Sequence, residues 1–115
     1  MVKEKPSSDP TYTYFSDLNL EAQVPPGGIL SRTLHSAQSK TVIFAFDAGQ
    51  ELSEHTAARP AILHILSGQG LLKLGTDEHP AKAGTWVYMP AGLVHAVRAE
   101  SPLVMLLTLL PKEQP

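Results

Sequence analysis

The sequence predicts an all-β sandwich or barrel formed by a single domain. Short runs of apolar and β-branched residues recur along the chain, and each is bounded by Gly, Pro, Asp or Ser, as is typical of strands joined by tight turns. The ten prolines and eight glycines fall at intervals that suit such turns. No window carries a helical stripe of apolar side chains free of proline and glycine. We therefore expect about nine or ten short strands and negligible helix.

The expected strands follow the apolar runs from one end of the chain to the other. The run 41–46, TVIFAF, is β-branched and aromatic, and the run 61–66, AILHIL, is apolar almost throughout. The remaining runs share the same turn-forming boundaries and cover 11–15, 28–34, 71–74, 85–89, 94–99 and 103–110.

Composition limits the class of protein. The chain has 115 residues, of which 43% are hydrophobic and 17% charged, so it can form a core and is not a disordered chain. A formal net charge of −2 provides no basic surface for nucleic acid or an anionic membrane. The absence of cysteine excludes disulfides, Cys-ligated zinc, iron–sulfur clusters and thiol nucleophiles.

The ends of the chain indicate one domain with a short tail. Residues 1–10 are charged and proline-containing, which predicts a flexible N-terminal tail, and 11–111 are expected to form the barrel. No apolar segment follows the N-terminus, and the longest apolar run is far shorter than the roughly 20 residues that a membrane helix needs. The sequence therefore favours a cytoplasmic protein.

Two strands are apolar on both faces, which favours a homodimer. The outer face of a small sandwich normally contacts water, so its strands should alternate apolar and polar residues. The runs 61–66 and 103–110 do not alternate in this way. Trp86 and Tyr88 are expected on the same outer side, opposite Val87 and Met89. A second copy of the chain would cover such a surface.

One segment places a histidine within a glycine frame. Gly49 is followed by five residues and then by His55, and Gly68 ends the segment. Between them lie Ala57, two residues beyond the histidine, and Ala61, which precedes the closing glycine by seven positions.

A second segment, GTWVYMPAGLVH, has a similar frame. Gly84, Pro90, Gly92 and His95 follow one another at set spacings, and Ala99 stands four residues further on. Together the two segments resemble the two motifs of the cupin family. The resemblance covers about 28–110 and implies a double-stranded β-helix, the jelly-roll barrel of that family.

The resemblance also implies a metal site that this chain preserves in part. Intact cupins hold a divalent metal with three histidines and one glutamate. His55 and His95 stand at two of those positions, whereas Ala57 and Ala61 replace the second histidine and the glutamate, and Ala99 replaces an asparagine. Imidazole ligands would select zinc, nickel, iron or copper.

His64 is the candidate for a third ligand. It is the polar residue of AILHIL, and two orientations remain open. If position 61 faces inward, then Leu63 and Ile65 also face inward and His64 faces outward. A bulge near Pro60 would shift the register by one residue and turn His64 into the barrel. His35 and His79 are expected at the surface, the latter in a charged turn.

The same alternation predicts an apolar ligand pocket beside the histidines. Val97 shares a face with His95, and Met89, Leu63 and Ile65 are expected to line the same interior together with one face of the run 41–46. Apolar walls with few polar groups are the usual composition of a small-ligand site. The simpler interpretation is that these residues are core.

Two functions from different classes remain open. The first is a small cupin with a His-based divalent-metal site that binds or transforms a small metabolite, as a dioxygenase, isomerase or sugar-metabolite enzyme would. The second is a metal-free ligand-binding or sensing module, which the two alanines favour because they remove ligands and enlarge the pocket. A barrel that serves only as an interaction scaffold is a third possibility, since fold does not decide function.

Overall fold

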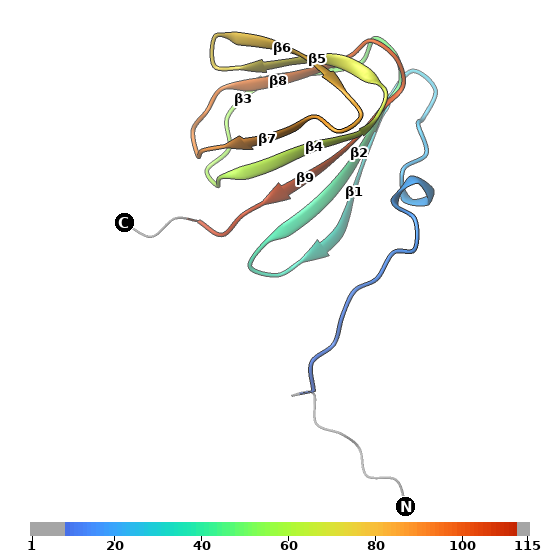
Figure 1. The fold of residues 1–115 in the computed structure, drawn as a ribbon, viewed down its shortest axis with the longest axis vertical. Coiled ribbons are helices and arrows are strands. Elements are labelled where there is room, and N and C mark those ends of the chain that lie inside the picture. Colours follow the sequence, from blue (N-terminus) through green and yellow to red (C-terminus); the bar gives the residue numbers. More distant parts are fainter. Residues whose placement is uncertain (1–8, 113–115) are drawn as a thin grey trace, which may run out of the picture.

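Two antiparallel sheets face each other in the computed structural model, which describes residues 9–112 (Figure 1). The strands of this part are β1 (Ile29–Ser36), β2 (Lys40–Phe46), β3 (Glu51–His55), β4 (Ala61–Ser67), β5 (Gln69–Leu74), β6 (Asp77–Lys82), β7 (Trp86–Met89), β8 (His95–Ala99) and β9 (Leu103–Leu109). The first sheet has the order β1-β2-β9-β4-β7 and the second the order β3-β8-β5-β6. The predicted all-β class is confirmed. Of the predicted tail 1–10, residues 1–8 lie outside the described part.

The helical content matches the expectation of negligible helix. Within 9–112 it consists of η1, a 3-10 turn (Leu18–Glu21) that Asp17 begins by accepting a hydrogen bond from the Asn19 backbone amide. No helix in that range is long and apolar enough to cross a membrane.

The sequence patterns missed two strands and placed one that is absent. β3 and β6 are the outer strands of the second sheet and bury little, so neither shows an apolar run. The predicted strand 11–15 is wrong: this segment pairs with no strand in the described part of the chain, and Tyr12 and Tyr14 are largely exposed. β propensity alone does not form a strand in a segment that pairs with no neighbouring strand.

Strand β2 is apolar on both faces because it takes part in two cores. Phe46 and, at its margin, Phe44 belong to the cluster between the sheets. Ile43 and Ala45 belong to a second cluster on the outer face, where the N-terminal segment packs against them through residues such as Ala22. Figure 1 shows this segment beside β1 and β2. The first sheet is therefore covered on its outer side over β2.

The same outer face is uncovered over β4 and β7. Trp86 and Tyr88 are 58% and 47% exposed and lie across from His64 and Ile62 of β4. Their neighbours on the strand, Val87 and Met89, are half-buried and buried. The predicted outward orientation of the two aromatic residues is thus confirmed.

Gly68, the last glycine of the first motif, is required because another part of the backbone approaches it closely. Gly68 turns the chain from β4 into β5 with a φ of 88°. A Cβ there would lie 2.7 Å from the Leu103 Cα and still closer to the Pro102 carbonyl oxygen. Gly84 also has a positive φ, of 96°, but a Cβ at that position would meet nothing within 4 Å.

Gly68→Ala is expected to destabilise the fold more than Gly84→Ala. The first substitution adds a backbone clash to the left-handed strain, for a combined loss of about 2–4 kcal/mol in the free energy of unfolding. The second adds strain alone, about 1 kcal/mol. Thermal unfolding should show a melting temperature roughly 10 °C lower for Gly68→Ala than for the wild type, with a smaller decrease for Gly84→Ala. Equal decreases would contradict the clash.

Candidate functional site

Antiparallel pairing of β3 with β8 brings the two frame histidines together. His55 is the register partner of His95, and the ring centroids lie 4.1 Å apart with the planes tilted by 60°. A register shift between Leu52 and His55 lies just before the pair. The two positions are 40 residues apart along the chain, so only the sheet makes them neighbours.

Alternation in β8 directs its histidine into the barrel. His95 is 8% exposed, and Val97 and Ala99 are also buried, whereas Arg98 is exposed. His55 is exposed on β3. The imidazole pair therefore reaches from the interior to solvent, with one ring shielded and the other accessible.

Backbone carbonyl groups hold both imidazoles in the same way. The Nδ1 of His55 lies 2.8 Å from the Ser53 carbonyl oxygen, and the Nδ1 of His95 lies 2.9 Å from that of Leu93. Because a carbonyl oxygen can only accept, Nδ1 is the protonated nitrogen in each ring. In the neutral ring, Nε2 then carries a lone pair. The pair thus presents two hydrogen-bond acceptors or metal donors at one place.

Burial lowers the pKa of His95 below its ordinary value. The Leu93 carbonyl oxygen acts in the opposite direction because it stabilises the proton-bearing ring, and the neighbouring His55 adds a smaller lowering effect. His95 is therefore neutral at pH 7.

His64 does not join the pair. The pairing of β4 with β7 and with β9 is regular from Ala61 to His64, so no bulge near Pro60 turns the strand. Leu63 is buried in the interior, and His64 lies on the opposite face, across from Trp86. The orientation that would have made His64 a third ligand is wrong for this structure, because the alternation of the strand is unbroken there.

The remaining predicted site residues pack in the core. Leu63, Ile65, Met89 and Val97 are each at most 2% exposed and belong to the cluster between the sheets. Ala61, where the family has its glutamate, lies across from Met89. These apolar side chains surround the interior as packed core, which matches the simpler interpretation of the sequence.

The other two histidines are exposed, as expected. His35 lies near the end of β1. His79 lies within β6, across from Leu72, and not in the turn that its sequence context suggested. In 9–112, no three His, Cys, Asp or Glu side chains are grouped so that they could hold a metal ion.

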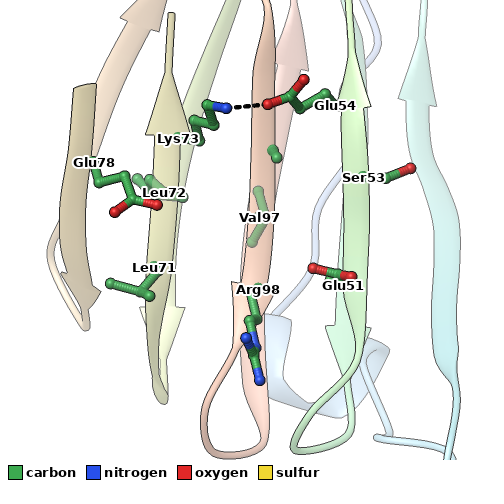
Figure 2. Close-up of a pocket in the computed structure, with 10 residues that line it drawn as sticks. Glu51, Ser53, Glu54, Leu71, Leu72, Lys73, Glu78, Val97 and Arg98 are labelled. Carbon is green, nitrogen blue, oxygen red and sulfur yellow. Dashed lines mark hydrogen bonds and ion pairs between the residues drawn. The ribbon is translucent and has the colours of Figure 1, made fainter. Parts of the chain in front are cut away.

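A charged groove of about 290 Å³ lies on the outer face of the second sheet (Figure 2). Lys73 forms an ion pair with Glu54, which raises the pKa of the lysine. Glu78 lies across from Lys73 on β6, and Glu51 lies across from Arg98. Charges of both signs therefore face one another on this surface. Neither glutamate of β3 takes the Nδ1 proton of His55, whose partner is a backbone oxygen.

Comparison with known proteins identifies the family. Residues 42–109 match the model of the cupin domain, so the chain belongs to the cupin family. The matched segment contains both histidines of the pair and both glycine frames. The predicted cupin-type barrel is confirmed. No curated protein sequence is significantly similar to this chain.

Solved structures share the fold over most of the chain. A conserved protein of unknown function from Streptococcus pyogenes is 30% identical, with a TM-score of 0.79 over 90% of this chain and 92% of its own. A cupin 2 conserved barrel domain protein from Leptotrichia buccalis is 29% identical, with a TM-score of 0.76 over 81% of this chain and 46% of its own. A protein from Thermus thermophilus is 23% identical, with a TM-score of 0.77 over 86% of this chain and 98% of its own.

The lowered pKa of His95 predicts a loss of stability in mild acid. The unfolded chain takes up a proton near the ordinary histidine pKa of 6.5, whereas the folded chain does so only at lower pH. The free energy of unfolding should therefore fall as the pH falls through that value, until the folded pKa is reached. Urea unfolding between about pH 7.5 and 5 should show this slope for the wild type and a smaller one for His95→Gln.

Apart from His55, whose ring contacts His95, the titratable groups keep the same surroundings in both proteins, so the difference between the two slopes reports on the imidazole pair. His35→Gln, at an exposed position, is the matched control and should keep the wild-type slope. A His95→Gln variant with an unchanged slope would show that burial of this ring does not shift its titration.

Proposed function

We propose that this protein binds a small, neutral, hydroxyl-bearing metabolite at the His55–His95 pair. The carrying observation is the arrangement of the two imidazoles, whose centroids are 4.1 Å apart and whose Nδ1 atoms are both occupied by backbone oxygens. Nε2 lone pairs on two neighbouring rings suit a ligand with adjacent O–H donors. The surrounding interior is apolar, so the pair would provide the orientation and the specificity.

The neutral state of the buried ring of His95 favours a neutral ligand over an anion. His95 is neutral at pH 7 because burial lowers its pKa. A neutral imidazole with a protonated Nδ1 accepts at Nε2 and offers no positive charge to a carboxylate or phosphate. Neutral sugars and polyols carry the required donors.

The donor set does not fit a permanently bound metal. Zinc sites in proteins use at least three protein ligands, and catalytic sites leave the fourth position open. Here Ala57 and Ala61 occupy the positions where the family has a histidine and its glutamate, and His64 lies on the other face. The described residues provide two imidazoles, which leaves half of a tetrahedral shell to solvent or ligand.

An exchangeable divalent cation is the second candidate. Hydrogen bonding of Nδ1 to a backbone carbonyl is the usual support of a metal-ligating histidine, and both rings have it. Zinc, nickel, iron or copper would suit imidazole donors. When bound, such a cation would act as a Lewis acid toward ligand oxygen atoms. This candidate leaves catalysis possible, whereas the first is a binding or sensing module.

Titration of the histidine ring protons by NMR should identify the ligand class. We expect at least one neutral sugar or polyol to shift the ring signals of His55 and His95 and to leave those of His35 unchanged. His55→Ala and His95→Ala should abolish the response, because each removes one acceptor, and His35→Ala should preserve it. The barrel should stay folded, since both strands keep their ladder neighbours.

The same signals distinguish the cation. Zinc or nickel that shifts both rings and is removed at once by a chelator would support exchangeable binding. If no neutral compound moves either ring while a cation binds tightly, the first proposal fails and the metal-dependent function takes its place. If neither the neutral compounds nor the cations shift the ring signals of His55 or His95, the pair is not a binding site.

We also propose that a second copy of the chain covers the outer face of β4 and β7. Ile62, Trp86 and Tyr88 form an uncharged surface there, which we call the β4–β7 patch. The N-terminal segment covers the adjacent region over β2 and leaves this one open. A contiguous exposed apolar surface in a small domain is typical of a protein interface.

Trp86→Glu is expected to convert a homodimer into a monomer. The substitution places a charge in the β4–β7 patch, and desolvating it on association is unfavourable. Sedimentation velocity at micromolar concentrations should give a dimer for the wild type and a monomer for the variant. Lys82→Glu, on the exposed edge of the other sheet, is the control and should remain dimeric. A wild type that sediments as a monomer would contradict the proposal.

A further inference from the structure

A cleft of about 550 Å³ opens between β6 and β7, where the edges of the two sheets meet without pairing. The second sheet contributes Leu72, Leu74 and His79 to its walls. The first contributes Val87, with Trp86 and Tyr88 at its rim. The cleft lies on the side of the barrel, away from the charged groove of the outer face, and its volume falls within the range of small-molecule sites.

The two sheets are joined at one end of the cleft, and a wall residue at the other end neighbours the buried imidazole. The turn after β6 brings the sheets together, because the Gly84 amide donates to the Ile65 carbonyl oxygen at 2.9 Å. Toward the start of β6 the edges separate, as Figure 1 shows. Leu74, in the wall of the cleft, is the register partner of His95. Leu74 therefore contributes both to the wall of the cleft and to the inner face of the sheet on which His95 lies.

Pro80 explains why the gap between the sheets is not sealed. It lies in the middle of β6 and has no N–H to donate to a further strand. β6 therefore ends the second sheet, and β7 ends the first. Side chains, and not a hydrogen-bonded ladder, form the walls between them.

The chemistry of the walls defines what they can hold. Leu72, Leu74 and Val87 are apolar, and the rim is aromatic. No Asp, Glu, Lys or Arg lines the cleft. A charged ligand would lose its hydration there without gaining a partner, whereas a flat apolar ring would bury its faces against leucine and the aromatic rim. His79 and Thr85 provide the polar side chains of the walls.

We propose that this cleft binds the ring-bearing part of a neutral ligand whose hydroxyl groups reach the His55–His95 pair. The hydroxyl-bearing part of this ligand rests on the proposed function of the His55–His95 pair. The ring-bearing part rests on the lining of the cleft. It adds a substrate class: a small, uncharged compound with an aromatic or alicyclic ring and a hydroxyl-bearing arm.

Benzyl alcohol is a suitable probe because it combines a neutral ring with a hydroxyl group. Trp86 is the single tryptophan of the chain and stands at the rim, so its emission reports on the cleft. We expect a saturable change in Trp86 emission with benzyl alcohol, and affinities at least about tenfold weaker for benzoate, which is charged, and for glycerol, which has no ring.

Two substitutions test the walls. Val87→Phe fills the cleft and His79→Ala removes one of its polar side chains, so each should weaken benzyl alcohol binding, the first by about tenfold or more. His35→Ala is the matched control for His79→Ala and should change nothing. If Val87→Phe fails to fold, as thermal melting would show, His79→Ala still decides, because that side chain is exposed.

Unchanged affinity in the folded wall variants, or equal binding of benzyl alcohol, benzoate and glycerol, would overturn the inference. Because association through the β4–β7 patch would also change Trp86 emission, the titration keeps the protein concentration fixed, and a change that does not saturate with benzyl alcohol would overturn the inference. His55→Ala with His95→Ala separates the two proposals. If benzyl alcohol still binds to the His55→Ala and His95→Ala variants but not to Val87→Phe, the result supports the cleft. That conclusion holds even if no sugar or polyol binds to the His55–His95 pair.

Discussion

Pairing of β3 with β8 is the interaction on which the site depends. It makes His55 and His95 register partners in the second sheet, with ring centroids 4.1 Å apart. The two residues are far apart in the sequence, so the pairing of the strands alone brings them together. A shift of this pairing by one residue would move a whole set of side chains to the other face. The register shift after Leu52 lies immediately before the pair, so the irregular part of β3 adjoins the proposed site.

Backbone carbonyl groups then determine what the imidazoles can do. Each Nδ1 is held by the carbonyl oxygen of the residue two positions earlier, Ser53 or Leu93. The ring orientation and tautomer follow from the strand itself and need no carboxylate. Glu54, next to His55 in sequence, is engaged with Lys73 on the outer face instead. Burial lowers the pKa of His95 and so favours the neutral form of that ring, which distinguishes it from a group that holds anions.

The edges and faces of the sheets explain the rest of the surface. Pro80 ends the second sheet at β6 and leaves a side cleft toward β7. The N-terminal segment covers the outer face over Ile43 and Ala45, and leaves Trp86 and Tyr88 exposed. These two aromatic residues therefore bound both the cleft and the β4–β7 patch. Ligand binding and association would meet at the same strand, β7.

Residue patterns alone predicted the all-β class, most of the strands and the histidine frame, because glycine spacing and apolar runs are local properties of the chain. They also predicted that Val97 faces inward and Trp86 outward, since alternation is local too.

Tertiary structure decided the rest. It showed the polar edge strands β3 and β6, which bury too little to leave an apolar run, and it left 11–15 unpaired. It set the orientation of His64, because only the pairing of β4 shows whether a bulge precedes it. The cupin resemblance had already assigned His55 and His95 to one site, but their contact depends on strand pairing across 40 residues, which no local residue pattern encodes.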